Sequence, residues 1–243
     1  MNNILITGGT GYIGEYLLKS DIFKNALFAG RQRPRKAKSF IFLDLEKNFD
    51  IQQELLGIDI IIHLAGLAHD MKRVTPELCR RYERVNTLAT VNLVKQAISS
   101  GVKRFIFIST IKVLGDKNSS ENPFTHQSLL NPIGPYATSK ADSEKEIIRL
   151  CAGSEMEYVI LRPPLIYGDK PKGNLKTLEM LAGLPIPIPL GSLENLRSLI
   201  SIQNFFDVLT LCMEHPSAAN ETLLVCDSNS VSTSELLGEL RRK

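Results

Sequence analysis

Two kinds of hydrophobic pattern alternate along this chain. Short, nearly continuous apolar runs are separated by longer segments in which apolar positions recur every three or four residues. A continuous apolar run is typical of a strand buried on both faces, and the longer spacing is typical of a helix with one buried face. The predicted strands cover residues 3–7, 26–30, 39–43, 58–64, 103–108, 157–162 and 222–226. The predicted helices lie near residues 12–20, 50–56, 76–100, 138–152, 174–182 and 204–214.

This alternation of strand and helix predicts an α/β fold, a Rossmann doubly wound parallel sheet. A chain of 243 residues is long enough for one large domain of this class with a small appendage. Pro, Gly and Lys become frequent after Gly168, so residues 168–192 should leave the sheet as a loop-rich lobe. Ser232-Thr233-Ser234-Glu235 has the composition of a helix N-cap, which predicts one more helix before the chain ends at Lys243.

Three glycines follow the first predicted strand. The apolar run Ile4-Leu5-Ile6 leads into Gly8, Gly11 and Gly14, and a helical segment follows at once. In a dinucleotide site such glycines permit a tight turn, a close backbone approach to the pyrophosphate, and close packing of helix on strand. The alternative is an ordinary turn between a strand and a helix. The order of strand, turn and helix favours dinucleotide binding.

The composition argues against several other classes of protein. No apolar run approaches the 20 or so residues of a membrane span, and the N-terminus lacks the basic segment of a signal peptide, so we expect no membrane insertion. A net charge of +3 is too small to indicate nucleic acid. The scattered Cys79, Cys151, Cys212 and Cys226 predict buried thiols with no metal site and no disulfide framework, and therefore a cytoplasmic location.

A second group of residues has the chemistry of a proton donor. Ser109 and Thr110 follow a predicted strand that ends at Ile108, and Tyr136 and Lys140 are spaced to share one face of a helix. We expect the ammonium to lower the pKa of the phenol, and the threonine hydroxyl to bond the same substrate oxygen. Such a group can move a proton while a hydride moves to or from a nicotinamide. A Tyr and a Lys at this spacing are, on their own, more often a solvated helix face.

The chain resembles the extended short-chain dehydrogenase/reductase family, in its nucleotide-sugar epimerase, dehydratase and reductase branch. The resemblance covers nearly the whole chain and keeps the family's order of motifs. Its motifs are TGGTGYIG (7–14), HLAG (63–66), VNTLATVNLVKQA (85–97), FISTIKVLG (107–115), YATSK (136–140), LRPPLIYG (161–168) and RSLISIQNFFD (197–207). Seven motifs in order are far more specific than any one of them.

The resemblance implies roles for particular residues. Thr110, Tyr136 and Lys140 would be catalytic. The cofactor-binding residues would be Gly8, Thr10, Gly11, Tyr12, Ile13, Arg31, Arg33, Asp44, Leu45, Leu64, Ala65, Gly66, Asn86, Tyr136, Lys140 and Pro163. The substrate-binding residues would be Thr110, Asn174 and Arg197, although Arg197 has a structural salt bridge as its alternative role.

The resemblance also implies an organisation into two parts. Residues 1–167, with 199–226 returning to them, would form the NAD(P)-binding domain. Residues 168–198 and 227–243 would form a substrate-binding lobe, expected to be incomplete because family members commonly continue further. The family pairs helices matching 76–100 and 138–152 across a two-fold axis, so we expect a homodimer built on a four-helix bundle.

Charge at the end of the second predicted strand bears on the form of the cofactor. NAD-binding members place a carboxylate there, whereas this chain has Arg31 and Arg33. A guanidinium suits a 2′-phosphate and a carboxylate would repel it, so NADP(H) is favoured over NAD(H). A solvated basic loop and a nucleic-acid patch are the alternatives for this cluster.

The two residues after the catalytic threonine narrow the choice of reaction. Dehydratases of this branch have an Asp-Glu pair there, whereas this chain has Ile111-Lys112, which disfavours 4,6-dehydration. Redox chemistry at C4 of a nucleotide sugar remains. Arg31 and Arg33, together with STIKVLG (109–115) and RSLISIQN (197–204), resemble bacterial 4-reductases of O-antigen synthesis. The resemblance implies a UDP-4-keto-6-deoxy-N-acetylhexosamine 4-reductase, with a UDP-sugar 4-epimerase as the alternative. A non-catalytic NADP(H)-binding regulator or scaffold is the alternative from another class.

Overall fold

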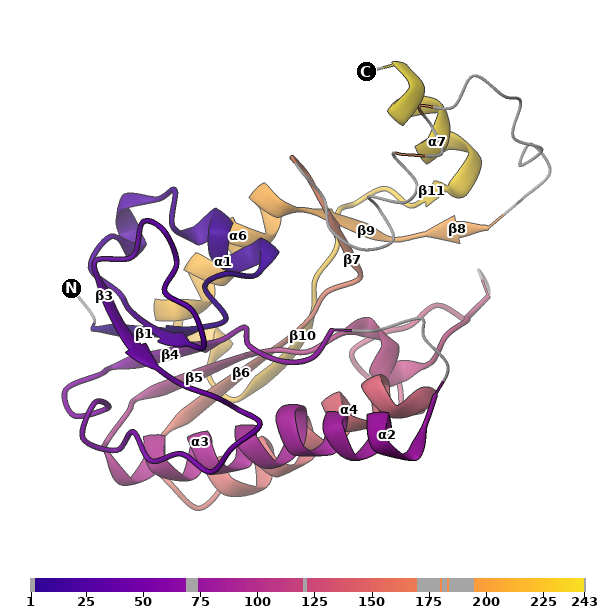
Figure 1. The fold of residues 1–243 in the computed structure, drawn as a ribbon. Helices are drawn as coiled ribbons and strands as arrows, with labels where there is room; N and C mark the ends of the chain where they lie inside the picture. Colours follow the sequence, from indigo (N-terminus) through magenta and orange to yellow (C-terminus); the bar gives the residue numbers. More distant parts are fainter. Residues whose placement is uncertain are drawn as a thin grey trace.

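A seven-stranded parallel sheet forms the centre of the molecule (Figure 1). The computed structural model describes residues 3–68, 74–119, 122–169 and 195–242, together with Met180 and Gly183. The strands are β1 (Ile4–Thr7), β2 (Leu27–Gly30), β3 (Ser39–Phe42), β4 (Ile60–His63), β5 (Arg104–Ile108), β6 (Glu157–Arg162) and β10 (Glu221–Leu224). Their order is β10-β6-β5-β4-β1-β2-β3, and all neighbouring pairs are parallel. Every predicted strand is present, and the Rossmann-like doubly wound fold is confirmed.

Two apolar layers cover the faces of this sheet. Ile4 and Ile6 of β1 point to one face, where α1 (Tyr12–Leu17) and α6 (Ile202–Glu214) pack. Leu5 points to the other face, against α3 (Ala89–Ser99) and α4 (Gly134–Cys151). Because side chains alternate along a strand, a continuous apolar run feeds both layers. Each fully buried Leu or Ile contributes roughly 1.5–3 kcal/mol relative to exposure.

The helix predicted over residues 76–100 is divided by a wider turn. It consists of α2 (Pro76–Tyr82), the π-helical segment η2 (Glu83–Leu88) and α3. The side chain of Asn86 in η2 is 1% exposed. Single π turns of this kind occur frequently at functional sites.

The structure differs from the predicted helices at residues 50–56 and at the start of α4 (Gly134–Cys151). Residues 50–56 form turns and no helix, because Asp50 Oδ1 accepts a hydrogen bond from the backbone N–H of Gln52 and closes a tight turn instead. Helix α4 begins at Gly134, four residues before the predicted start, with Pro135 in its first turn. Proline is suited to that position because its fixed φ is already helical. Tyr136 therefore lies in the first turn of α4.

Smaller elements continue beyond the carboxyl end of β6 (Figure 1). Strand β7 (Leu165–Tyr167) pairs with β9 (Leu199–Ser201), and β8 (Leu196–Arg197) pairs with β11 (Val231–Ser232). Helix α7 (Thr233–Arg242) follows β11 and confirms the predicted last helix. The helix predicted over residues 174–182 lies outside the described residues. The 3₁₀ turns are η1 (Asp21–Phe23), η3 (Ile111–Leu114) and η4 (Pro216–Ala218).

The cap of α7 has the reciprocal geometry of a capping box. Ser232 Oγ accepts from the N–H of Glu235, and Glu235 Oε2 accepts from the N–H of Ser232. Among the helices formed by the described residues, none has the length and apolar character that crossing a bilayer requires.

Candidate active site

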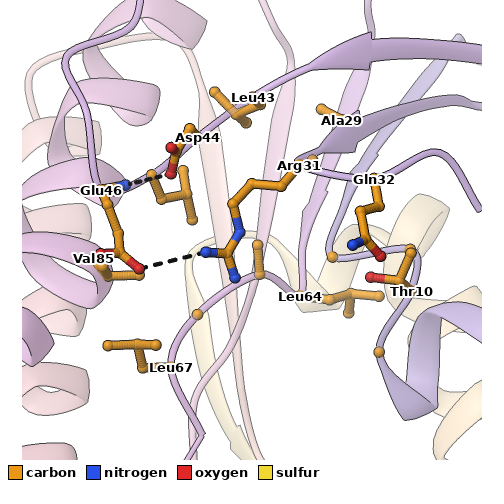
Figure 2. Close-up of a pocket in the computed structure, with 17 residues that line it drawn as sticks. Thr10, Ala29, Arg31, Gln32, Leu43, Asp44, Glu46, Leu64, Leu67 and Val85 are labelled. Carbon is orange, nitrogen blue, oxygen red and sulfur yellow. Dashed lines mark hydrogen bonds and ion pairs between the residues drawn. The ribbon is translucent and has the colours of Figure 1, made fainter.

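A cavity of about 610 Å³ opens at the carboxyl ends of β1, β2, β3 and β4 (Figure 2). The chain runs outward from β1 to β3 on one side and from β4 to β6 on the other, so the strand order reverses beside this cavity. Open α/β sheets bind their ligands at such a reversal. Its lining residues are Gly8, Gly9, Thr10, Gly11, Ala29, Gly30, Arg31, Gln32, Leu43, Asp44, Leu45, Glu46, Leu64, Ala65, Gly66, Leu67 and Val85.

The glycine turn forms the floor of the cavity and leaves no room for side chains. Gly8 has φ +75°, and a Cβ placed on it would lie 2.7 Å from the backbone nitrogen of Ala65. A Cβ on Gly14 would lie 2.5 Å from the carbonyl oxygen of Gly8. Helix α1 therefore starts directly against the turn.

The structure brings most of the expected cofactor-binding residues to this cavity. Those in its wall are Gly8, Thr10, Gly11, Arg31, Asp44, Leu45, Leu64, Ala65 and Gly66. The wall also contains residues that the sequence did not single out, namely Gly9, Ala29, Gly30, Gln32, Leu43, Glu46, Leu67 and Val85. Tyr12 and Ile13 lie in α1, beside the wall rather than in it.

Arg33 is not among the residues that line the cavity, so its predicted role there stays a prediction. Its Nε and Nη2 donate to the carbonyl oxygen of Ala37 at 3.2 and 3.0 Å, and Nη2 also donates to that of Lys38 at 2.7 Å. Carbonyl groups of the loop after β2 need donors that the sheet does not supply, and the guanidinium of Arg33 supplies them. Arg31 remains in the wall.

A pair of hydroxyl groups lies at the carboxyl end of β5. Thr110 caps η3, where its Oγ1 accepts from the N–H of Lys112 at 3.3 Å. The side chains of Thr110 and Tyr136 are hydrogen-bonded to each other. The ring of Tyr136 packs edge-on against that of Tyr82, with centroids 5.9 Å apart. The predicted juxtaposition of threonine and tyrosine is therefore present.

Lys140 lies one turn further along α4 and is buried. Its Nζ donates to the carbonyl oxygen of Ile108 at 2.8 Å and lies 4.4 Å from the ring centroid of Phe107. A Cβ placed on Gly66, in the cavity wall, would lie 3.7 Å from this Nζ. Burial lowers the pKa of Lys140 to about 8, and the nearby carboxylate of Glu144 opposes that change. The ammonium thus lies near the cavity wall at Gly66, one turn of α4 from Tyr136.

The pKa of Tyr136 differs from the expectation. The sequence predicts that the ammonium lowers it, whereas burial raises the pKa of this phenol to about 12, against the opposing hydrogen bond from Thr110. The physical reason is that removing the hydroxyl from water penalises the phenolate, and the ammonium is bonded to the Ile108 carbonyl instead. The phenol therefore stays protonated at neutral pH.

Asn86 joins the cavity to the turn of α4 that carries the phenol. Its Oδ1 accepts from the N–H of Leu67 at 2.8 Å, and its Nδ2 donates to Ser139 Oγ at 3.0 Å. Ser139 Oγ in turn donates to the carbonyl oxygen of Tyr136 at 2.8 Å. The π-helical segment η2 therefore places the amide of Asn86 between the cavity wall at Leu67 and the turn of α4 that carries Tyr136.

The remaining predicted residues lie further away. The carbonyl of Pro163 accepts from the N–H of Ile111, which holds η3 in place. Arg197 is exposed on β8, where it pairs with Val231, and it is not among the described residues of the cavity wall. Asn174 lies outside the described residues.

Comparison with known proteins agrees with this architecture. The model of the family described as NAD dependent epimerase/dehydratase matches residues 4–226. The chain belongs to the NAD dependent epimerase/dehydratase family. Its residues 4–226 span the cavity, Thr110, Tyr136 and Lys140 together.

Individual members of the epimerase/dehydratase family match over almost the full chain. A UDP-glucose 4-epimerase of Vibrio cholerae is 41% identical over 98% of this chain and 74% of its own length. An N-acetyl-alpha-D-glucosaminyl-diphospho-ditrans,octacis-undecaprenol 4-epimerase of Escherichia coli O157:H7 is 25% identical over 99% of this chain and 72% of its own length. The solved structure of MoeE5 in complex with UDP-glucuronic acid and NAD superimposes with a TM-score of 0.83 at 24% identity, covering 99% of this chain and 82% of that one.

The residues of the cavity fit the nicotinamide dinucleotide that the family name implies. Backbone without side chains forms the floor at Gly8 and Gly11, as a pyrophosphate requires. One end of the cavity offers Arg31 and Asp44, which are polar groups suited to an adenosine ribose and a base. The other end reaches Gly66, beside the ammonium of Lys140.

Burial of Lys140 predicts a measurable pH dependence of stability. Its pKa is about 8 in the fold and 10.5 in its ordinary state, so the unfolded chain binds more protons between these values. This group therefore adds stability as the pH rises from 8 to 10.5, by about 1–3 kcal/mol. Urea unfolding at pH 7.5 and 9.5 checks this, because Lys140→Met is expected to lack that increment; an equal increment in both proteins would contradict it.

Proposed function

We propose that this chain transfers a hydride at C4 of a nucleotide-diphosphate sugar, as a UDP-4-keto-6-deoxy-N-acetylhexosamine 4-reductase. The observation that carries the proposal is the pair Thr110 and Tyr136, one turn of α4 from buried Lys140, whose ammonium lies near Gly66 in the cavity wall. Membership of the epimerase/dehydratase family and the nucleotide-sugar relatives support the substrate class.

Each residue has a defined part in this reaction. Gly8, Gly11 and Thr10 would hold the pyrophosphate, Asp44 the adenine, and Lys140 the nicotinamide ribose. When bound, the nicotinamide supplies the hydride that reaches C4. The phenol of Tyr136 donates its proton to the C4 carbonyl oxygen, so the ketone gains one hydride and one proton and becomes an alcohol. Thr110 donates a hydrogen bond to that oxygen and keeps it in line with the phenol.

Two observations favour reduction as the net reaction. A phenol with its pKa raised to about 12 is a proton donor at neutral pH, which suits reduction of a ketone. Arg31 in the cavity wall also suits the 2′-phosphate of NADPH. A specific observation favours a second candidate, the UDP-sugar 4-epimerase: the relatives from Vibrio cholerae and Escherichia coli are both 4-epimerases. An epimerase reduces the same C4 ketone after first oxidising the alcohol.

The two candidates are separated by one pair of incubations. The purified protein is mixed with NADPH or NADH and a UDP-4-keto-6-deoxy-N-acetylhexosamine, and separately with NAD⁺ or NADP⁺ and UDP-glucose. Stoichiometric loss of the reduced cofactor in the first mixture supports the reductase. Formation of UDP-galactose in the second, without net loss of cofactor, replaces the reductase by the epimerase. Cofactor binding without turnover in either mixture contradicts both and leaves the non-catalytic regulator or scaffold.

A preference for NADP(H) over NAD(H) is part of the proposal and depends on Arg31. Its guanidinium lines the cavity, and its side chain is 62% exposed, so it can turn toward a phosphate. Arg31→Glu is expected to weaken NADPH binding about tenfold or more relative to NADH, because a carboxylate repels the 2′-phosphate. Titration of both reduced cofactors by fluorescence checks it; an unchanged ratio of the two Kd values would exclude this role.

The proposed organisation follows the same family pattern. Residues 1–167 with 199–226 would bind the cofactor, and residues 168–198 and 227–243, including Asn174 and Arg197, would contact the sugar nucleotide. We propose a homodimer through the layer of α3 and α4, where Leu88 and Ile148 remain 55% and 38% exposed. A cytoplasmic place in O-antigen synthesis would suit an enzyme that uses UDP sugars.

A further inference from the structure

Three charged side chains meet at the wall of the cavity next to β2 and β3. Glu46 Oε1 accepts from Arg81 Nη2 at 2.6 Å and from Arg81 Nε at 3.3 Å. The same oxygen lies 3.5 Å from Nη1 of Arg31 (Figure 2). Arg31 and Glu46 both line the cavity, whereas Arg81 lies behind them on α2. The carboxylate therefore bridges one guanidinium inside the cavity and one outside it.

The two contacts of Glu46 differ in strength. Arg81 makes two N–H donations to a single oxygen, which is a close and charge-assisted arrangement. Arg31 makes one contact at the outer limit of hydrogen-bond distance, from a side chain that is 62% exposed. Glu46 is thus held firmly by Arg81 and holds Arg31 loosely.

The backbone of Glu46 is fixed as well. Asp44 Oδ1 accepts from the N–H of Glu46 at 3.1 Å and closes the turn that follows β3 (Figure 2). The hydrogen bond from Arg81 holds the pKa of Glu46 below its ordinary value, so the carboxylate stays ionised at neutral pH. The cavity wall therefore carries the fixed negative charge of Glu46 beside the positive charge of the exposed Arg31 side chain.

A fixed carboxylate at this position opposes a phosphate in two ways. It repels a phosphate directly, and it competes for the donors of Arg31 that a 2′-phosphate needs. The same oxygen atoms can accept a hydrogen bond from a 2′-hydroxyl, as the carboxylate after the second strand does in NAD-binding Rossmann proteins. Here the carboxylate comes from the segment after β3 instead.

We propose that Glu46, held by Arg81, determines the preference of this chain between NADP(H) and NAD(H) by controlling Arg31. Glu46 limits the preference for NADP(H) that Arg31 gives, because the contact with Glu46 holds a donor of Arg31 that a 2′-phosphate needs. This inference rests on the proposed binding of a nicotinamide dinucleotide in the cavity, and it adds a specificity residue that lies 15 positions from Arg31 in the sequence.

The test is the ratio of the Kd values for NADH and NADPH, measured by fluorescence titration at low ionic strength. Glu46→Gln keeps the size of the side chain and removes its charge. It is expected to tighten NADPH binding about fivefold or more relative to NADH. The matched control is Glu146→Gln, because Glu146 is also paired with an arginine, Arg149, and is 35% exposed against 30% for Glu46. The control should leave both Kd values unchanged.

A double variant separates control through Arg31 from direct repulsion. If Glu46 acts through Arg31, the gain from Glu46→Gln should shrink when Arg31→Gln is also present, to the part that direct repulsion accounts for. A gain of the same size without Arg31, or an unchanged ratio in Glu46→Gln, overturns the proposal. If the unaltered protein binds neither NADPH nor NADH, the proposed function itself fails, and that result is distinct from an unchanged ratio.

Discussion

Replacing Tyr136 with phenylalanine is expected to lower turnover about 10²- to 10⁴-fold while cofactor affinity stays within about twofold. The hydroxyl of Tyr136 is bonded to Thr110 and has a pKa of about 12, so it is the proton donor in the proposed reduction. The ring remains and still packs against Tyr82. Steady-state turnover with saturating cofactor and substrate, together with a separate cofactor titration, measures the two quantities independently.

The control for this variant is a tyrosine of the central sheet that does not line the cavity. Tyr158 is in β6, in register with Phe105 of β5, so Tyr158→Phe should leave turnover nearly unchanged. If Tyr136→Phe retained the turnover of the control, Tyr136 would not be the proton donor. If both cofactor affinity and turnover collapsed, the change would have disturbed the cavity rather than removed a proton.

The second large effect is expected on stability, at the ion pair between α4 and β6. Arg162 Nη2 donates to Glu144 Oε2 at 2.6 Å, and the two side chains are only 8% and 1% exposed. Arg162→Met is expected to lower the free energy of unfolding by about 3–5 kcal/mol, because it leaves the carboxylate of Glu144 buried without a partner. Urea unfolding followed by circular dichroism measures this change.

Two further variants identify the cause of that loss. Adding Glu144→Gln to Arg162→Met removes the stranded charge and should restore part of the lost stability. Arg149→Met breaks the exposed pair with Glu146 and should leave the unfolding midpoint almost unchanged. Equal losses from Arg162→Met and Arg149→Met would contradict this explanation, since burial is the stated difference between the pairs.

The strands and the floor of the cavity could be predicted because their signals are local. A run such as Phe105-Ile106-Phe107-Ile108 is apolar at every position, as a strand covered on both faces must be. The predicted helix over 50–56 was wrong because one side chain, Asp50, closes a turn that the apolar spacing does not reveal. The π turn around Asn86 has the same apolar spacing as the helices on either side.

The charges of the site depend on contacts that a sequence does not display. Arg33 and Arg31 are equivalent in the sequence, yet only the structure shows that Arg33 donates to the carbonyls of its own loop. Glu46 gains its role from Arg81, which lies 35 residues away. The pKa of Tyr136 is raised because its phenol is buried, and that burial depends on how α4 packs beside β5.

Transfer of an isotope from the cofactor tests the central claim most directly. The protein is incubated with a UDP-4-keto-6-deoxy-N-acetylhexosamine and a reduced nicotinamide cofactor that carries two deuterium atoms at C4 of its ring, and the sugar is examined by NMR. We expect one deuterium at C4 of the sugar with the unaltered protein, and a rate at least about 100-fold lower with Tyr136→Phe. Binding of both compounds without deuterium at C4, or equal rates for the two proteins, would contradict the proposed hydride transfer.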